Sequence, residues 1–140
     1  MIFVKTMSSG IASGIMVGIG GAVYMSCEDK VVGAVLFSVA LLSICCLGMY
    51  LYTGKIGYLA EDFTKKTLIS LLAGLIGNFI GATLLGLICA YARPGIVEKA
   101  QTACSAKLES GVLRAVILGA LCGILMFIAV KIYRDCKSIS

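Results

Sequence analysis

Apolar and charged residues alternate in long blocks along the chain, and these blocks predict membrane-spanning helices. Four apolar segments cover residues 7–27, 31–60, 67–92 and 112–130. Charged stretches separate them at residues 28–30, 61–66 and 93–114. A helix needs about 20 apolar residues to cross the hydrocarbon core of a bilayer, and each segment has roughly that length. We therefore expect residues 1–140 to form a single, all-α transmembrane domain with about four spans.

The second apolar segment is too long for one straight helix. From Val31 to Ala60 its only charged residue is Lys55. A helix of this length would measure about 45 Å at about 1.5 Å per residue, whereas the hydrocarbon core is about 30 Å thick. Glycines at 48, 54 and 57 gather towards its far end. Broken helices in transporters mark the substrate path, so we expect a break near residues 51–57 and take it as the first candidate site.

The composition agrees with an integral membrane protein. The chain is 60% hydrophobic and only 14% charged, with a mean hydropathy of +1.05, whereas soluble domains are about 25% charged. The net charge of +5 is scattered between apolar runs without a basic stripe, which argues against a nucleic-acid partner. More Lys and Arg fall on the side of the N-terminus than on the other side. This favours a multi-pass protein of the cell (plasma or inner) membrane with both termini in the cytoplasm.

Glycines recur at four-residue spacing within the spans. They are Gly10, Gly14 and Gly18 in the first, Gly77 and Gly81 in the third, and Gly119 and Gly123 in the fourth. Small residues let helix backbones approach closely in lipid, so we expect a tightly packed bundle. The first and fourth spans also align at an offset of 101 residues, since SSGIASG at Ser8 matches ESGVLRA at Glu109. This internal similarity suggests that the fourth span begins a second copy of the repeat that starts with the first span, as in inverted repeats.

The chain offers little for catalysis, cofactor binding or metal binding. It has seven cysteines but no histidine and no CxxC pair, so a zinc set is not expected. We interpret the cysteines as small hydrophobes. The adjacent Cys45 and Cys46 are the redox candidate, and they leave a four-span thiol oxidoreductase as one further hypothesis. We expect no enzyme activity, no cofactor and no metal.

Several segments together resemble the formate/nitrite transporter family. They are the glycine-rich first span SGIASGIMVGIGGAVYMSC, FSVALLSICCLGMYLYTG at 37–54, LAGLIGNFIGATLLGL at 72–87, the lysine in SAKLESG, and RAVILGALCGILMFIAV at 114–130. The resemblance implies an aquaporin-like fold of six spans in two inverted repeats, with a broken second span. It also implies a homopentamer in which each protomer has its own pore. This chain would then be the fold truncated to about four spans.

The resemblance also implies a substrate path. Phe37 and Leu41 would line one apolar constriction and Leu51 another, Thr53 would face the pore near its centre, and Lys107 would attract anions to the outer mouth. Asn78 lies mid-span, where it would either line the pore or hydrogen-bond between helices. Small monovalent anions of the formate, nitrite or hydrosulfide type would be concentrated by positive charge. They would cross the apolar rings as the neutral acid, because a bare charge is too costly to bury.

The chain departs from the family pattern in ways that suggest an alternative. The family places a histidine in the broken fifth span, whereas this sequence has no histidine. The loop reads Thr53-Gly54-Lys55, where asparagine is frequent in the third position. The first repeat is complete and the second only begun. The leading hypothesis is therefore an anion channel or transporter subunit, and the alternative is a half-transporter that conducts only with a complementary half-chain.

Overall fold

The structure, a computed structural model, describes residues 2–61 and 63–139 and is helical throughout its regular elements. The elements in order are α1 (Ile2–Ser26), α2 (Lys30–Cys46), the 3-10 helix η1 (Ile56–Leu59), α3 (Lys65–Ala92), α4 (Pro94–Glu109) and α5 (Val112–Ile139). Among the described residues, three helices are long and apolar enough to cross a membrane: Phe3–Ser26, Lys65–Ala92 and Val112–Cys136. The chain is thus an all-helical, membrane-embedded protein.

Helices α1 and α3 run parallel and touch through their backbones. A Cβ atom on Gly77 would lie 2.5 Å from the Met7 carbonyl oxygen, and one on Gly10 would lie 2.9 Å from that of Gly74. Gly14 and Gly81 make the next contacts along the same pair of faces. The glycine spacing in these two spans therefore serves the close packing expected from the sequence.

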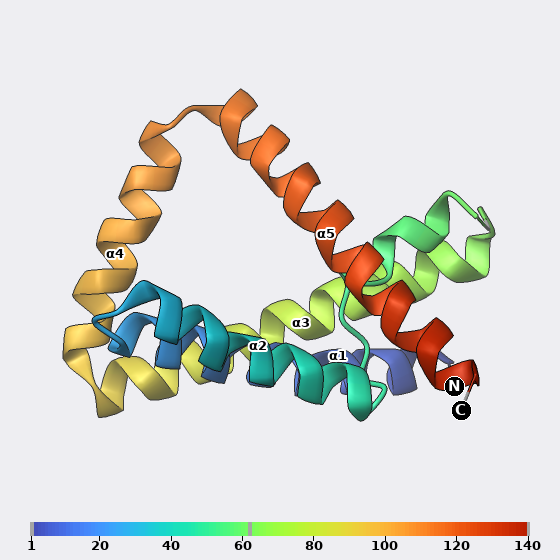
Figure 1. The fold of residues 1–140 in the computed structure, drawn as a ribbon, viewed down its shortest axis with the longest axis horizontal. Helices are drawn as coiled ribbons and strands as arrows, with labels where there is room; N and C mark the ends of the chain where they lie inside the picture. The colour runs from blue at the N-terminus through green and yellow to red at the C-terminus, as the bar shows by residue number, and fades with distance from the viewer. Residues whose placement is uncertain (1, 62, 140) are drawn as a thin grey trace.

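Helix α2 packs antiparallel against α1 and then ends early. Phe37 contacts Gly20, and Gly33 lies under Tyr24. Asp29 caps the start of α2 by accepting a hydrogen bond from the Val31 amide at 2.7 Å. At the other end Gly48 adopts φ +64°. Figure 1 shows the chain leaving the helix at this point and crossing the bundle without regular secondary structure.

The end of α2 is a Schellman motif. The Gly48 amide donates to the Cys45 carbonyl at 3.2 Å, and the Met49 amide donates to the Ile44 carbonyl at 3.0 Å. This pairing needs a left-handed residue after the helix, which glycine supplies. The helix therefore ends at Cys46, before the 51–57 stretch in which the sequence suggested the break. The irregular backbone runs from residue 47 to residue 55, where η1 follows.

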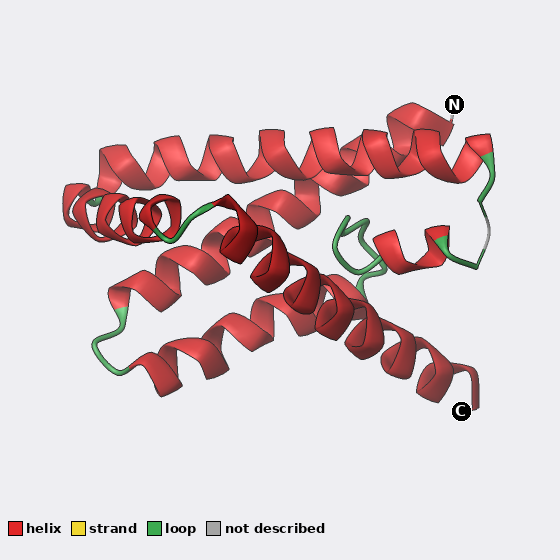
Figure 2. Cartoon of the chain, turned by 90° about the horizontal axis from the view of Figure 1, so that it is seen from above, coloured by secondary structure: helices red, strands yellow, loops and turns green. Residues whose placement is uncertain are grey.

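Helices α4 and α5 form a second arm. The charged stretch between the third and fourth apolar segments contains α4, which starts at Pro94, a position that suits the first helical turn. Gly111, with φ +86°, turns the chain from α4 into α5. In Figure 1 the two helices rise away from α1–α3 and α5 returns across the break, and Figure 2 shows α5 running obliquely over the other helices.

Candidate functional site

Side chains of α1 and α3 hold the irregular segment after α2 in place. The Tyr50 amide donates to Ser9 Oγ at 2.9 Å, and Ser13 Oγ donates to the Tyr50 carbonyl at 2.7 Å. Ser13 is completely buried. These bonds satisfy backbone groups that a helix would have paired internally, as irregular backbone at membrane depth requires. Ser9 and Ser13 both belong to the SSGIASG run, whose small residues predicted helix packing and gave no sign of this role.

Asn78 on α3 completes this arrangement. Its Oδ1 accepts from the Tyr52 amide at 2.8 Å, while its Nδ2 donates to Ser13 Oγ at 2.7 Å, the Gly10 carbonyl at 2.9 Å and the Tyr50 carbonyl at 3.0 Å. One amide therefore joins α1, α3 and the break. Of the two interpretations left open by the sequence, these bonds favour hydrogen bonding between helices over pore lining.

Ser9, Ser13 and Asn78, which hold the break by hydrogen bonds, are called the clamp below. Thr53 is exposed and lies on the side of the break away from the clamp, where it faces α5. It lines a cavity of about 330 Å³ between the break and α5. The walls are otherwise mostly apolar: Tyr52, Ile56, Gly57, Gly119, Ala120, Gly123, Ile124 and Phe127. In the described part of the chain, no atom lies within 4 Å of a Cβ built on Gly119 or Gly123. These two glycines, expected from the sequence to pack against another helix, instead leave room in front of Thr53.

Leu51 is separate from this cavity. It is buried, with 9% of its surface exposed, and it borders a smaller cavity of about 70 Å³. Phe37 and Leu41 are half-buried on α2 and are not among the residues that line the Thr53 cavity. The structure therefore brings Leu51 and Thr53 together in the break but leaves Phe37 and Leu41 on a neighbouring helix.

Lys107 lies on another element altogether. It sits in the last turn of α4 and is exposed. Helix α4 lies away from the break in both overall views (Figures 1 and 2). Lys107 does not contribute to the Thr53 cavity within this chain.

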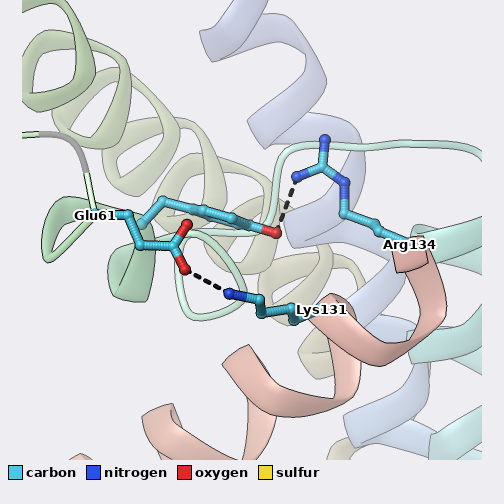
Figure 3. Close-up of polar contacts among 4 residues, drawn as sticks. Glu61, Lys131 and Arg134 are labelled. Atoms are coloured by element: carbon cyan, nitrogen blue, oxygen red, sulfur yellow. Dashed lines mark hydrogen bonds and ion pairs between the residues drawn. The ribbon is translucent and has the colours of Figure 1, made fainter. Parts of the chain in front are cut away.

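Contacts with α5 fix the outer wall of the site. Lys131 forms an ion pair with Glu61 at 2.5 Å, and Arg134 Nη1 donates to the Tyr58 hydroxyl at 3.1 Å. Figure 3 shows these two contacts side by side. The rings of Tyr58 and Phe127 meet edge to face, with centroids 5.0 Å apart. Together these contacts attach the C-terminal half of α5 to the segment that follows the break.

All seven cysteines are free thiols. Tyr133 donates a hydrogen bond to Cys46 Sγ at 3.2 Å. Among the described residues, no group of three His, Cys, Asp or Glu side chains could hold a metal ion.

Comparison with known families identifies one relationship. The model of the family described as formate/nitrite transporter matches residues 1–140. No curated protein and no solved structure matches the chain. The family match spans the α1–α3 clamp, the break and α5 alike, and it confirms the resemblance drawn from the sequence.

Proposed function

The chain belongs to the formate/nitrite transporter family, and from this premise we propose that it forms one pore-lining unit for small monovalent anions. Membership makes it a membrane protein of a transporter family, embedded in the lipid bilayer and with an anion as substrate. The finer proposal is a path that carries formate, nitrite or hydrosulfide past the break between α2 and η1. The substrate crosses the apolar part of this path as its neutral acid.

The Thr53 cavity carries this proposal. Its walls are apolar except for the threonine and Tyr52, so a bare anion would lose its hydration there without adequate replacement. A low dielectric raises the pKa of an acid, which favours protonation of the substrate as it enters. The Thr53 hydroxyl then stabilises the substrate by a hydrogen bond at the centre.

The other candidate residues take supporting roles in this proposal. Leu51, Phe37 and Leu41 form the apolar constrictions that exclude water on either side of Thr53. Lys107 concentrates anions at the outer mouth. Asn78 acts as a positioning residue, since its amide is occupied by the backbone of the break and by α1.

We further propose an aquaporin-like arrangement in the cell membrane, with inverted repeats assembled as a homopentamer. Both ends of the helical chain, the start of α1 and the end of α5, lie at the same end of the molecule in two views (Figures 1 and 2). This supports a topology with both on the cytoplasmic side, as the distribution of Lys and Arg also indicates.

A second candidate function rests on α5. None of its most apolar stretch is buried within the described chain, so the Thr53 cavity needs further protein to close it. On this alternative, the chain is a half-transporter that conducts only when a complementary half-chain covers α5. The two candidates share the same cavity and differ in what completes it.

Uptake of labelled formate into proteoliposomes tests the proposal. Thr53→Val keeps the shape of the side chain and removes the hydroxyl, and loss of one hydrogen bond to the substrate lowers flux about fivefold. Thr53→Ser retains the hydroxyl and keeps most of the flux. Formate uptake also rises as the external pH falls, because more of the acid is neutral. Equal flux in the valine variant and the parent protein would contradict the role of Thr53.

A further inference from the structure

A second, smaller cavity lies beside the break and has the chemistry of an anion site. We propose that Lys55 and Arg134 together bind one formate or nitrite ion there, next to Leu51, before the substrate enters the apolar part of the path. The inference rests on the proposed transport function, and it adds a binding site that the family match does not assign. The two residues are far apart in the sequence, since Lys55 lies in the break and Arg134 lies on α5.

The geometry brings both cations to one small space. The cavity measures about 70 Å³, and both Lys55 and Arg134 line it together with Leu51. The remaining walls are apolar or small: Ile44, Cys45, Gly48, Met49, Gly54, Val130 and Tyr133. Its volume exceeds the roughly 10–15 Å³ that a single water needs and suits a three-atom anion better than a large carboxylate.

The electrostatics of the cavity are unbalanced. The Lys55 ammonium and the Arg134 guanidinium carry like charges and line the same small cavity, so they repel each other. None of the described residues that line the cavity is acidic. Glu61 is engaged in its ion pair with Lys131. The Asp135 carboxylate also attracts the Lys131 ammonium. A bound anion would offset the repulsion between Lys55 and Arg134. An isolated lysine on the surface has no such repulsion to offset.

Aromatic rings orient both cations without occupying all their donors. Lys55 Nζ lies 5.0 Å from the centre of the Tyr50 ring, and the Arg134 guanidinium lies 5.5 Å from that of Tyr58. Within the described part of the chain, Arg134 donates a hydrogen bond to the Tyr58 hydroxyl. A guanidinium has five N–H donors and an ammonium three. Charge-assisted hydrogen bonds to an anion therefore remain geometrically possible from both sides of the cavity.

Binding of ¹³C-formate to the purified protein in detergent, followed by NMR line broadening, tests the site without requiring transport. Lys55→Gln and Arg134→Gln each weaken binding about fivefold, as expected for one partly exposed charge contact. Lys55→Arg restores most of the affinity. Lys66→Gln is the matched control, because Lys66 is an exposed lysine at the start of α3 outside the cavity. It leaves binding unchanged.

Flux measurements on the same variants separate this inference from the proposed function. If the parent protein transports formate but Lys55→Gln and Arg134→Gln bind and transport with unchanged half-saturation, the site is wrong and the function stands. If binding is lost in both variants while the parent protein shows no flux, the site stands and the function is wrong. Absence of formate binding to the parent protein overturns the site outright.

Discussion

Asn78 shows how a single side chain supports a break in a membrane helix. Its amide meets four partners, two of them backbone groups of the segment between α2 and η1. In lipid an unpaired backbone group costs several kcal/mol, so the extended path of residues 49–52 depends on this amide and on the neighbouring serines. The position of Thr53 follows directly from that path.

Asn78→Ala therefore reduces both stability and transport. The Tyr52 amide and the Tyr50 carbonyl each lose a partner, which costs about 1–3 kcal/mol of folding free energy. Thermal unfolding in detergent measures this loss, and formate flux falls because Thr53 is no longer held at the cavity. Ser38→Ala is the control, since Ser38 is exposed and bonds only to Val35 of its own helix. A normal unfolding midpoint with normal flux would contradict the positioning role.

For single residues, the sequence pointed to Asn78 but did not settle its role, and it did not point to the serines that act with it. Asn78 stood out as the only asparagine in the chain, in the middle of an apolar span. Interhelical bonding was favoured over pore lining, but both stayed open because the choice depends on which way the helix faces. Ser9 and Ser13 were missed, since serine among small residues is also what ordinary helix packing requires.

The pairing of α1 and α3 is the firmest contact between elements. Gly14 and Gly81 face the opposite helix with almost no space for a side chain, and a Cβ on Gly81 would collide with the Ile11 carbonyl oxygen. Because this pair carries Ser9, Ser13 and Asn78, the clamp on the break depends on how closely the two helices approach.

Gly81→Ala is expected to separate these helices. Overpacking of this kind costs about 1–3 kcal/mol, which exceeds the gain of about 1 kcal/mol from replacing a helical glycine by alanine. Gly86→Ala on the same helix is the matched control, because no described atom lies within 4 Å of a Cβ at Gly86. We expect a lower unfolding temperature for the first variant and an equal or higher one for the second. The reverse order would contradict the close-packing interpretation.

Element boundaries were harder to predict than the existence of the elements. Gly48, Thr53, Gly54 and Gly57 together predicted a break, which was placed near residues 51–57, but α2 already ends before Gly48 because the Schellman motif forms there. The polar residues between 93 and 114 hid α4, since charge spacing alone does not separate a loop from a solvent-exposed helix. Gly119 and Gly123 looked like packing residues because their spacing equals that of Gly77 and Gly81. Their use as cavity wall depends on where α5 lies.

At the scale of the whole molecule, the most prominent feature is the unburied apolar surface of α5. Its exposed large side chains include Leu113, Val116, Ile117, Leu121 and Leu125, and no residue of its most apolar stretch is buried by the described chain. Lipid can cover such a surface, but lipid would also enter the space in front of Thr53. A selective path past Thr53 requires protein there, whether from further spans or from another chain.

This requirement makes the assembly state a test of mechanism. Native mass spectrometry of the 140-residue chain released from detergent is expected to give a closed oligomer, with a pentamer near five times 14.6 kDa. When one surface binds a different surface of the next copy, the copies form a ring if the rotation between them closes. Monomers without flux that begin to transport formate when a complementary half-chain is co-expressed would instead support the half-transporter. Monomers that conduct alone would contradict both, because the Thr53 cavity would then need no covering protein.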